Sequence, residues 1–173
     1  LDPANNNLWH ANVRRLDFEA FRDSLLAMAG TLDRSTIGGP SVNITEEPYS
    51  FRRSVYGYVD RANISDLLMQ FDVSNPDQPN TKRTSTIVPQ QALFLMNSSF
   101  VAAVVQNIVK RPEIIQGVRD GTDRGINAVY RVVLQRLPTQ TERQRAINFL
   151  VSESKMQATV KAEASELNKA ATK

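Results

Sequence analysis

The chain has 173 residues, of which 41% are hydrophobic and 23% charged, with a formal net charge of +3, values that are ordinary for one globular domain. It has no cysteine and a single histidine, His10, which excludes disulfides, thiolate or multi-histidine metal sites, covalent haem attachment and a cysteine nucleophile within this chain. No apolar run approaches the roughly 20 residues that a membrane span requires, and no Lys/Arg run or basic stripe predicts nucleic-acid binding.

The first predicted element is an amphipathic helix near the start of the chain. Asn12 is its expected N-cap and Gly30 its expected end, because short polar residues favour N-caps and glycine favours the left-handed position after a helix. Its apolar residues recur at spacings of three and four; they are Phe18, Phe21, Leu25, Met28 and Leu32. Residues 31–49 are rich in turn formers and lack a periodic apolar face, so they are expected to form a long loop.

The middle of the chain predicts two short helices followed by a second long loop. Ser50 is expected to cap a helix over residues 51–61, although the alternation of valine and tyrosine across residues 55–59 leaves a strand as the alternative. Residues 64–71 form the second short helix. Residues 72–88, rich in Asn, Pro and Asp at their start, are expected to be the least regular segment of the chain.

A longer helical stretch follows. Pro89 suits the first turn of a helix, where its missing N–H costs nothing. An apolar face then runs through Leu93, Met96, Phe100, Val104 and Ile108. Asn97 or Ser98, in the middle of this face, is expected to cap a new helix and so divide the stretch in two. A further connection between helices is indicated by Pro112, Gly117 and Asp120-Gly121.

Two more helices complete the prediction. Thr122 is expected to cap the first, whose apolar face consists of Ile126, Val129, Val133 and Leu137. Thr139 and Glu142 match a capping box that opens the second. That last helix loses apolar content over residues 156–173, where it is expected to fray or to continue into sequence beyond this chain.

The elements sum to an all-α fold: an irregular bundle of about six helices with long ordered loops, in a single domain over residues 1–173. The chain begins without methionine, on Asp2-Pro3 and an asparagine triplet. We therefore expect a domain excised from a larger protein.

Known sequence motifs for catalysis and for phosphate or calcium binding are not matched by this sequence. The sequence has neither a G-x-S-x-G elbow nor a G-x-x-x-x-G-K phosphate loop. Residues 72–83 resemble a calcium loop but place Asp77 where glycine is required and Arg83 where a bidentate glutamate is required. A looser oxygen-ligand site stays open as an alternative. No cofactor, metal or catalytic residue is predicted.

One polar cluster in the central third of the sequence has two interpretations. Its members are Arg52, Arg53, Tyr56, Asp72, Arg83 and Gln90, with Arg61, Ser85, Thr86, Gln91 and Asn97 in the wider set. Guanidinium groups paired with carboxylates or carbonyls commonly fix irregular loops, and this structural interpretation is favoured. The same groups are suited to an anionic ligand such as a sulfate, a phosphate or a uronate.

An enzyme acting on polysaccharide is the alternative from a different class. It would need two carboxylates facing each other across a cleft, within about 10 Å. The candidates are Asp17, Asp23, Asp33 and Asp72. Four carboxylates that lie apart, or that pair with arginines, would count against this alternative.

A series of motifs in register resembles one planctomycete family over about residues 2–150. They are Arg14-Arg15-Leu16-Asp17, Arg22-Asp23-Ser24-Leu25-Leu26, Gly38-Gly39-Pro40-Ser41, Arg52-Arg53-Ser54-Val55-Tyr56, Phe71-Asp72, Arg83 with Ser85-Thr86, Pro89-Gln90-Gln91-Ala92-Leu93, Leu95-Met96-Asn97, Tyr130-Arg131, Arg136-Leu137-Pro138-Thr139 and Glu142. The family is the PSD-one domain of unknown function, found towards the C-terminus of large planctomycete proteins with cytochrome-c-like domains. The resemblance implies a bacterial, exported, multidomain parent protein, and it implies no activity.

The resulting hypothesis is a non-catalytic helical accessory module, extracytoplasmic by resemblance, whose partners are neighbouring domains of the parent protein. An anionic-glycan-binding module is one alternative, and part of a polysaccharide-active enzyme is the other.

Overall fold

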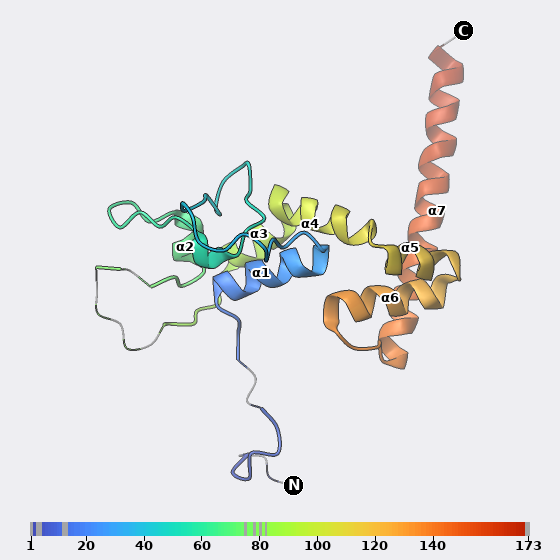
Figure 1. The fold of residues 1–173 in the computed structure, drawn as a ribbon. Coiled ribbons are helices and arrows are strands. Elements are labelled where there is room, and N and C mark those ends of the chain that lie inside the picture. Colours follow the sequence, from blue (N-terminus) through green and yellow to red (C-terminus); the bar gives the residue numbers. More distant parts are fainter. Residues whose placement is uncertain are drawn as a thin grey trace. The chain divides into compact units, whose positions relative to one another are not determined.

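The computed structural model describes residues 2, 5–11, 14–74, 76–77, 79, 81 and 83–171, with side chains as far as Met156. Within these residues the chain forms seven α-helices and one short 3₁₀ helix, η1, and no strand (Figure 1). The all-α prediction is therefore confirmed. The count is close to the expected six, although one helix forms in a predicted connection and one predicted helix does not form.

The chain divides into two compact units, residues 1–107 and residues 108–173. The prediction of a single domain remains a prediction. The first unit holds α1 (Phe18–Ala29), η1 (Ser54–Tyr56), α2 (Asp66–Gln70), α3 (Pro89–Asn97) and most of α4 (Ser99–Val109). The second holds α5 (Pro112–Arg119), α6 (Thr122–Leu134) and α7 (Gln140–Ala171).

Helix α1 begins later than predicted, and after Phe18 its buried face is shifted by one residue from the predicted face. Its N-cap is Asp17, in extended conformation, whereas Asn12 lies outside the described residues. Gly30 ends the helix as predicted, with a φ of 73°. The buried face consists of Phe18, Arg22, Leu26 and Ala29, so the predicted stripe through Phe21, Leu25 and Met28 is only half-buried.

The predicted helix over residues 51–61 is wrong. Only the single 3₁₀ turn of η1 forms there, between two isolated parallel bridges that pair Arg52 with Asp33 and Gly57 with Val42. Outside that turn, backbone groups of this segment bond to distant partners: the Val42 N–H donates to the Tyr56 carbonyl, and the Tyr58 N–H donates to the Val42 carbonyl. The alternative of extended backbone is closer to what forms.

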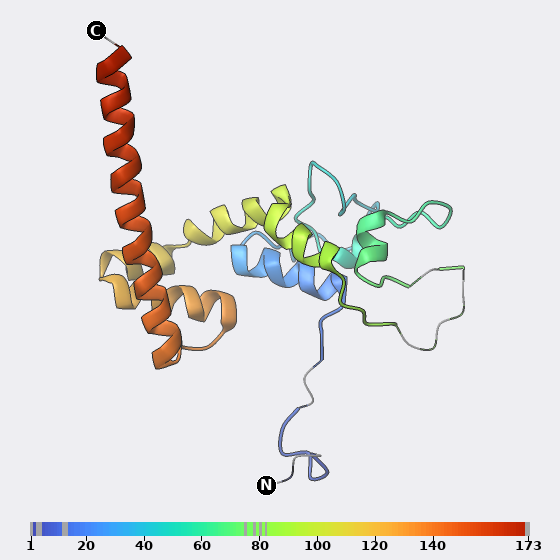
Figure 2. The same ribbon diagram turned by 180° about the vertical axis from the view of Figure 1, so that it is seen from behind.

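A small apolar core lies beneath these loops. Phe18, Ile44 and Leu68 are buried together, and the Phe71 ring lies 5.2 Å from that of Phe18. Gly57 is required where the loops cross this core, because a β-carbon there would lie 2.4 Å from Ile44 Cδ1. Long loops connect α1 to α2 and α2 to α3 (Figures 1 and 2).

The predicted break between α3 and α4 is confirmed, but the continuous apolar face is not. Ser98 has extended backbone, its hydroxyl accepts a hydrogen bond from the Phe100 N–H, and the two helices are bent by 51°. The bend leaves Phe100 and Val104 buried, while Met96 is 80% exposed. No single described helix is long and apolar enough to cross a membrane, although the bent pair α3–α4 meets that criterion by length and composition together.

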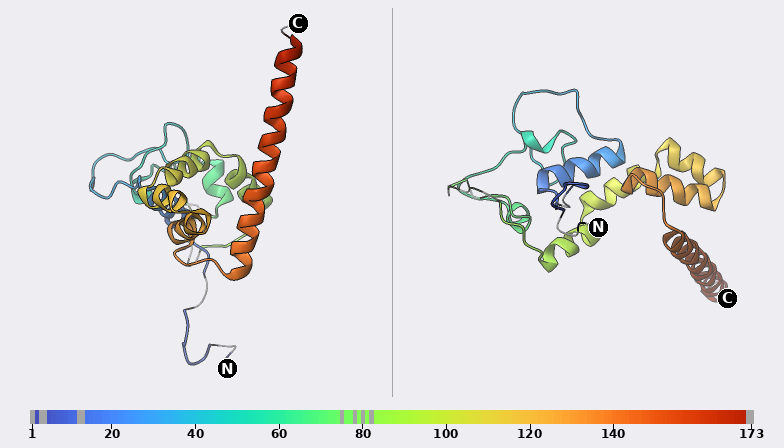
Figure 3. Two further views of the ribbon diagram at one scale, coloured as in Figure 1. Left: turned by 90° about the vertical axis from the view of Figure 1, so that its right-hand side faces the viewer. Right: turned by 90° about the horizontal axis from the view of Figure 1, so that it is seen from below.

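The second unit contains the helix that the sequence analysis missed. Residues 112–119 form α5, with Pro112 in its first turn, and α5 lies against α6 (Figure 3). Gly117 predicts a connection, but a β-carbon there would lie 2.9 Å from Ala128 Cβ and 3.0 Å from the Arg124 carbonyl oxygen. The glycine permits two helices to approach closely, and it ends no helix.

The start of α6 differs from the prediction and the start of α7 matches it. Gly121, with a φ of 125°, is the N-cap of α6, and Thr122 is its first helical residue. At α7 the Thr139 N–H donates to the Glu142 carboxylate at 2.8 Å, and the Glu142 N–H donates to Thr139 Oγ1 at 3.3 Å, which confirms the capping box. The backbone of α7 is helical to Ala171.

Candidate functional site

The six residues predicted to form a cluster separate into two sets of contacts within residues 1–107. Arg52, Arg53 and Tyr56 belong to a network that is centred on Arg22 of α1. We call it the Arg22 network; its other members are Asp23, Ser50 and Ser54. Asp72 and Arg83 belong to a second set, the Asp72 network, which includes Arg15, Glu19, Thr86 and Gln91. Gln90 is exposed and belongs to neither.

Arg22 is the most deeply buried charged side chain among the described residues, with 2% of its surface exposed. Its guanidinium donates to the Arg52 carbonyl at 3.1 Å, to Ser54 Oγ at 3.2 Å and to the Ser50 carbonyl. It also lies 5.4 Å from the centre of the Phe100 ring. Burial lowers the pKa of Arg22, and the neighbouring Asp23 carboxylate opposes that shift. One buried cation therefore holds the backbone of residues 50–54 against α1.

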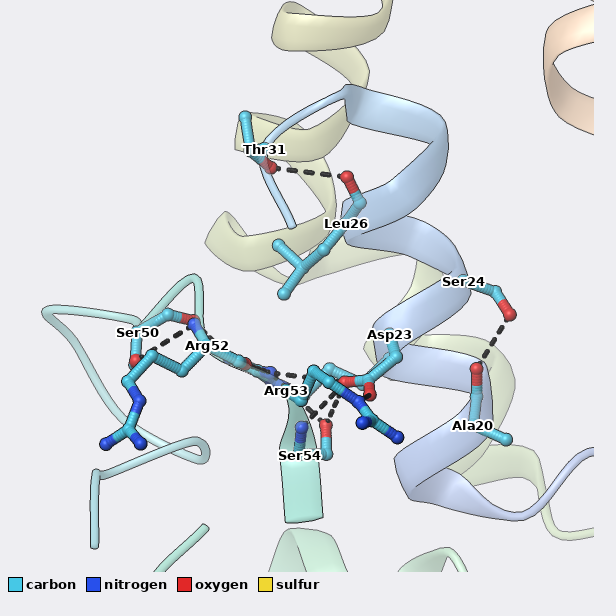
Figure 4. A network of polar contacts seen from close by, with 10 residues as sticks. Ala20, Asp23, Ser24, Leu26, Thr31, Ser50, Arg52, Arg53 and Ser54 are labelled. Atoms are coloured by element: carbon cyan, nitrogen blue, oxygen red, sulfur yellow. Dashed lines mark hydrogen bonds and ion pairs between the residues drawn. The ribbon is translucent and has the colours of Figure 1, made fainter. Parts of the chain in front are cut away.

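Asp23 completes this attachment from the next position of α1. Its Oδ1 accepts hydrogen bonds from the Ser54 N–H at 2.8 Å and from the Ser54 hydroxyl at 2.7 Å (Figure 4). Together Arg22 and Asp23 bind both donors and acceptors of the same short segment. The segment is thereby fixed in the conformation that excludes a longer helix.

Arg52 and Arg53 are adjacent in sequence but point to opposite sides (Figure 4). The Arg52 guanidinium lies 4.3 Å from the centre of the Tyr56 ring and donates to the carbonyls of Pro40 and Gly38. It therefore holds the turn at residues 38–40. Arg53 is 57% exposed, and its Nε lies 4.0 Å from Asp23 Oδ2.

Asp72 organises the second set. It has a φ of 57°, unusual for an aspartate, and accepts hydrogen bonds from the Thr86 N–H at 2.8 Å and the Thr86 hydroxyl at 2.7 Å. Burial acts to raise the pKa of Asp72, but these hydrogen bonds and the charge of Arg15 outweigh it and lower the pKa overall. Asp72 closes the loop of residues 72–86 and stays ionised.

Gln91, and not its predicted neighbour Gln90, is the buried amide of α3. Its Oε1 accepts from Arg15 at 2.6 Å, and its Nε2 donates to the Gln70 carbonyl at 2.6 Å. Arg15 also donates to the Thr86 carbonyl. The amide thus joins the segment before α1, the end of α2 and the start of α3.

Arg83 forms a bidentate ion pair with Glu19 of α1, at 2.7 and 2.8 Å. The hydrogen bonds from Arg83 lower the pKa of Glu19, although burial acts in the opposite direction. The pair fixes the far end of the loop of residues 72–88 to α1. A cleft of about 390 Å³ lies beside it, lined by Arg14, Arg15, Asp17, Asp72 and Arg83 among others.

A family model described as PSD1, protein of unknown function (DUF1553), matches residues 1–150. The chain belongs to the PSD1 family. The match spans both networks, together with α5, α6 and the first part of α7. No curated protein and no solved structure matches the chain.

The four carboxylates that the enzyme alternative requires differ in their surroundings in this PSD1 chain. Asp23 binds Ser54 and Asp72 binds Thr86. Asp33 Oδ1 accepts hydrogen bonds from Ser35 and Thr36, which hold the pKa of its carboxyl well below its usual range. A general acid for glycoside cleavage needs the opposite shift.

Asp17 and Asp72 line the same cleft. Across the part of the PSD1 chain that the structure describes, no group of three or more histidine, aspartate or glutamate side chains is arranged to hold a metal ion. The geometry therefore favours loop fixation for the predicted polar residues.

Two α1 residues that hold the loops, Arg22 and Glu19, were not among the predicted polar residues. Arg22 lies four residues after Phe18 and four before Leu26, and all three are buried. An arginine at this position of an apolar stripe is a signal of a buried, hydrogen-bonded cation. The partner of Arg83 carries no such signal, because Glu19 lies 64 residues earlier in the sequence.

Proposed function

We propose that the chain is a non-catalytic helical accessory module of a larger exported bacterial protein and acts by packing against neighbouring domains of that protein. The observation that carries the proposal is the exposed apolar face of α3. Met96 is 80% exposed, Leu93 on the same face is exposed, and Ile87 just before the helix is 91% exposed. Exposed apolar surface that is grouped in this way is typical of an interaction site.

A second apolar surface supports the proposal. A cleft of about 660 Å³ lies between the end of α1 and α4, with Tyr49, Phe51, Phe100 and Val104 in its lining. The Phe51 side chain is exposed at its rim. Aromatic side chains in a shallow apolar cleft favour contact with another protein surface.

The use of the arginines also supports a structural role. Arg22, Arg52 and Arg83 donate to carbonyl, hydroxyl or carboxylate groups of the same unit. A guanidinium committed to the fold has few donors left for a substrate. The polar residues then keep the loops in place while the apolar faces meet the partner.

The chain has no cysteine, so one introduced thiol can be followed alone in the 173-residue chain, and in the parent protein it is followed in its own peptide by mass spectrometry. Met96→Cys is placed on the exposed face of α3, and Ser41→Cys, in an exposed loop, serves as the matched control. Maleimide labelling rates are measured for each variant in the 173-residue chain and in the full-length parent protein. We expect Met96→Cys to label at least tenfold more slowly in the parent protein, and Ser41→Cys to label equally in both.

Equal labelling of Met96→Cys in the two proteins would overturn the proposed packing. Protection of the same thiol by lipid vesicles, without protection in the parent protein, would also overturn it and would indicate a bilayer as the partner. Turnover of a polysaccharide that Asp17→Asn or Asp72→Asn abolishes would overturn the non-catalytic assignment.

A further inference from the structure

A second polar cleft, of about 530 Å³, lies within residues 1–107 on the side of α1 that carries Asp23. Two arginines, Arg34 and Arg53, line it, and we call it the Arg34–Arg53 cleft. Tyr56, Leu32 and Ile37 form the apolar part of its lining. Its volume is in the range of ligand-binding sites.

Unlike Arg22, Arg52 and Arg83, the two arginines of this cleft have donors to spare. Arg34 is exposed and makes no hydrogen bond or ion pair with the described residues. Arg53 approaches Asp23 only through its Nε, at 4.0 Å, so both of its terminal nitrogens are unengaged. By contrast, Arg22, Arg52 and Arg83 use their terminal nitrogens within the fold.

The backbone beneath each of these arginines is fixed. On either side of Arg34, Asp33 accepts hydrogen bonds from Ser35 and Thr36, and the Asp33 N–H donates to the Phe51 carbonyl at 2.8 Å. Arg53 lies between two residues, Arg52 and Ser54, that are held by Arg22 and Asp23. Placing both side chains on fixed backbone lowers the entropic cost of binding a ligand between them.

The rest of the lining indicates what the ligand carries besides negative charge. Asp23 Oδ1 accepts both hydrogen bonds from Ser54. Asp23 Oδ2 lies 4.0 Å from Arg53 Nε and is available to accept a hydrogen bond from a hydroxyl group. Leu32, the Tyr56 ring and the 85% exposed side chain of Ile37 offer apolar surface. Hydroxyl groups, an apolar ring face and an anionic group occur together in acidic sugars.

We infer that the Arg34–Arg53 cleft binds an acidic sugar, with the two guanidinium groups on its carboxylate or sulfate and Asp23 accepting from a ring hydroxyl. The oxyanion is the shared chemistry of uronates and sulfated sugars. This inference is independent of the packing surface on α3, because the two surfaces share no residue that carries either argument.

The experiment titrates the 173-residue chain with D-glucuronate and with glucose 6-sulfate, with glucose as the neutral probe and inorganic sulfate as the bare anion. Binding is followed by the amide chemical shifts of residues 32–37 and 53–56. The test variant is the double substitution Arg34→Gln and Arg53→Gln. The control is the double substitution Arg61→Gln and Arg14→Gln, which removes the same charge from exposed arginines outside the cleft.

We expect at least one acidic sugar to bind, with affinity at least tenfold lower in the Arg34/Arg53 variant and unchanged in the control variant. Ile37→Ser is expected to weaken binding of the sugar without altering the amide chemical-shift changes that inorganic sulfate causes. The acidic sugar that binds more tightly identifies the source of the oxyanion.

Several results would overturn the inference. They are absence of binding by both acidic sugars, equal binding of glucose, equal weakening in the two double variants, and inorganic sulfate binding as tightly as the sugars. Both double variants must retain the unfolding midpoint of the parent chain, which the exposed positions of these arginines lead us to expect. The outcome leaves the labelling test of the α3 face unaffected, so the two proposals can fail separately.

Discussion

In residues 31–54 the backbone carbonyls of four loop positions are bound by arginine side chains, whereas the backbone groups of residues 112–134 bond within α5 and α6. The first unit therefore fixes irregular backbone with polar side chains. The second packs two regular helices through glycines at their contact. Each strategy satisfies buried backbone groups, but the sequence features that encode them are different.

The comparison has an energetic consequence. A buried guanidinium with three acceptors is costly to remove, because its partners lose their hydrogen bonds without regaining water. A glycine at a helix contact is sensitive to any added atom, because neighbouring helices cannot separate without losing packing. The two units should respond to different kinds of substitution.

Removing the central cation of the first unit should have the largest effect. We expect Arg22→Met to lower the free energy of unfolding by about 3 kcal/mol, since it leaves the Ser50 and Arg52 carbonyls and the Ser54 hydroxyl without their donor. Urea denaturation followed by circular dichroism measures the loss. Arg14→Met, at an exposed position, is the control, and an equal loss in both variants would contradict a special role for Arg22.

Adding a side chain at the helix contact of the second unit should come next. We expect Gly117→Val to cost about 2 kcal/mol, because even its β-carbon meets Ala128 and the Arg124 carbonyl. Arg119→Val places the same side chain at an exposed position two residues later. Thermal unfolding of both variants compares them, and a Gly117→Val protein as stable as the Arg119→Val protein would show that α5 and α6 are not in close contact.

The start of α7 should be weakened by a smaller amount. Thr139→Ala removes the hydroxyl that accepts from the Glu142 N–H, and the loss of such a cap costs about 1 kcal/mol. Hydrogen exchange of the first-turn amides of α7 should become faster. Thr141→Ala, inside the helix, controls for the loss of a threonine; faster exchange in that variant alone would contradict the assigned cap.

The smallest effect is expected from the partly exposed ion pair between the loop and α1. Glu19→Gln should cost about 0.5–1 kcal/mol at neutral pH. Arg83 lowers the pKa of Glu19 below 4.5, so the contribution is complete above about pH 4.5 and disappears as the pH falls through the lower pKa of the folded protein. Unfolding free energies between pH 7 and pH 3 should therefore converge for the parent chain and Glu19→Gln. Glu153→Gln is the control, and curves that stay parallel would rule out this linkage.

The regular parts of both units could be predicted from the sequence. Helical spacing, Gly30 and the Thr139–Glu142 box are local signals, and they identified helices and ends that the structure confirms. Gly117 shows where local signals mislead, because a glycine required for helix contact has the same appearance as one that ends a helix. Only the position of the partner helix distinguishes the two.

The arrangement of the polar residues could be predicted only in part. Three of the predicted polar residues have partners that lie 12 to 64 residues away in sequence; they are Arg52, Asp72 and Arg83. The segment over residues 51–61 was predicted to be helical for the same reason: the competing acceptors and donors come from Arg22 and Asp23 of α1. Arg34, alone on a fixed turn, carries no sequence pattern at all.

The burial of Arg22 also sets an order of events during folding. Its three acceptors lie 28 to 32 residues further along the chain, so α1 can form early but cannot bury this face until a loop of that length has closed. Leaving the guanidinium dry and unpaired would cost more than the closure itself. We therefore expect burial of this face of α1 and ordering of the loop after it to occur as one cooperative step, because the Arg22 guanidinium needs both.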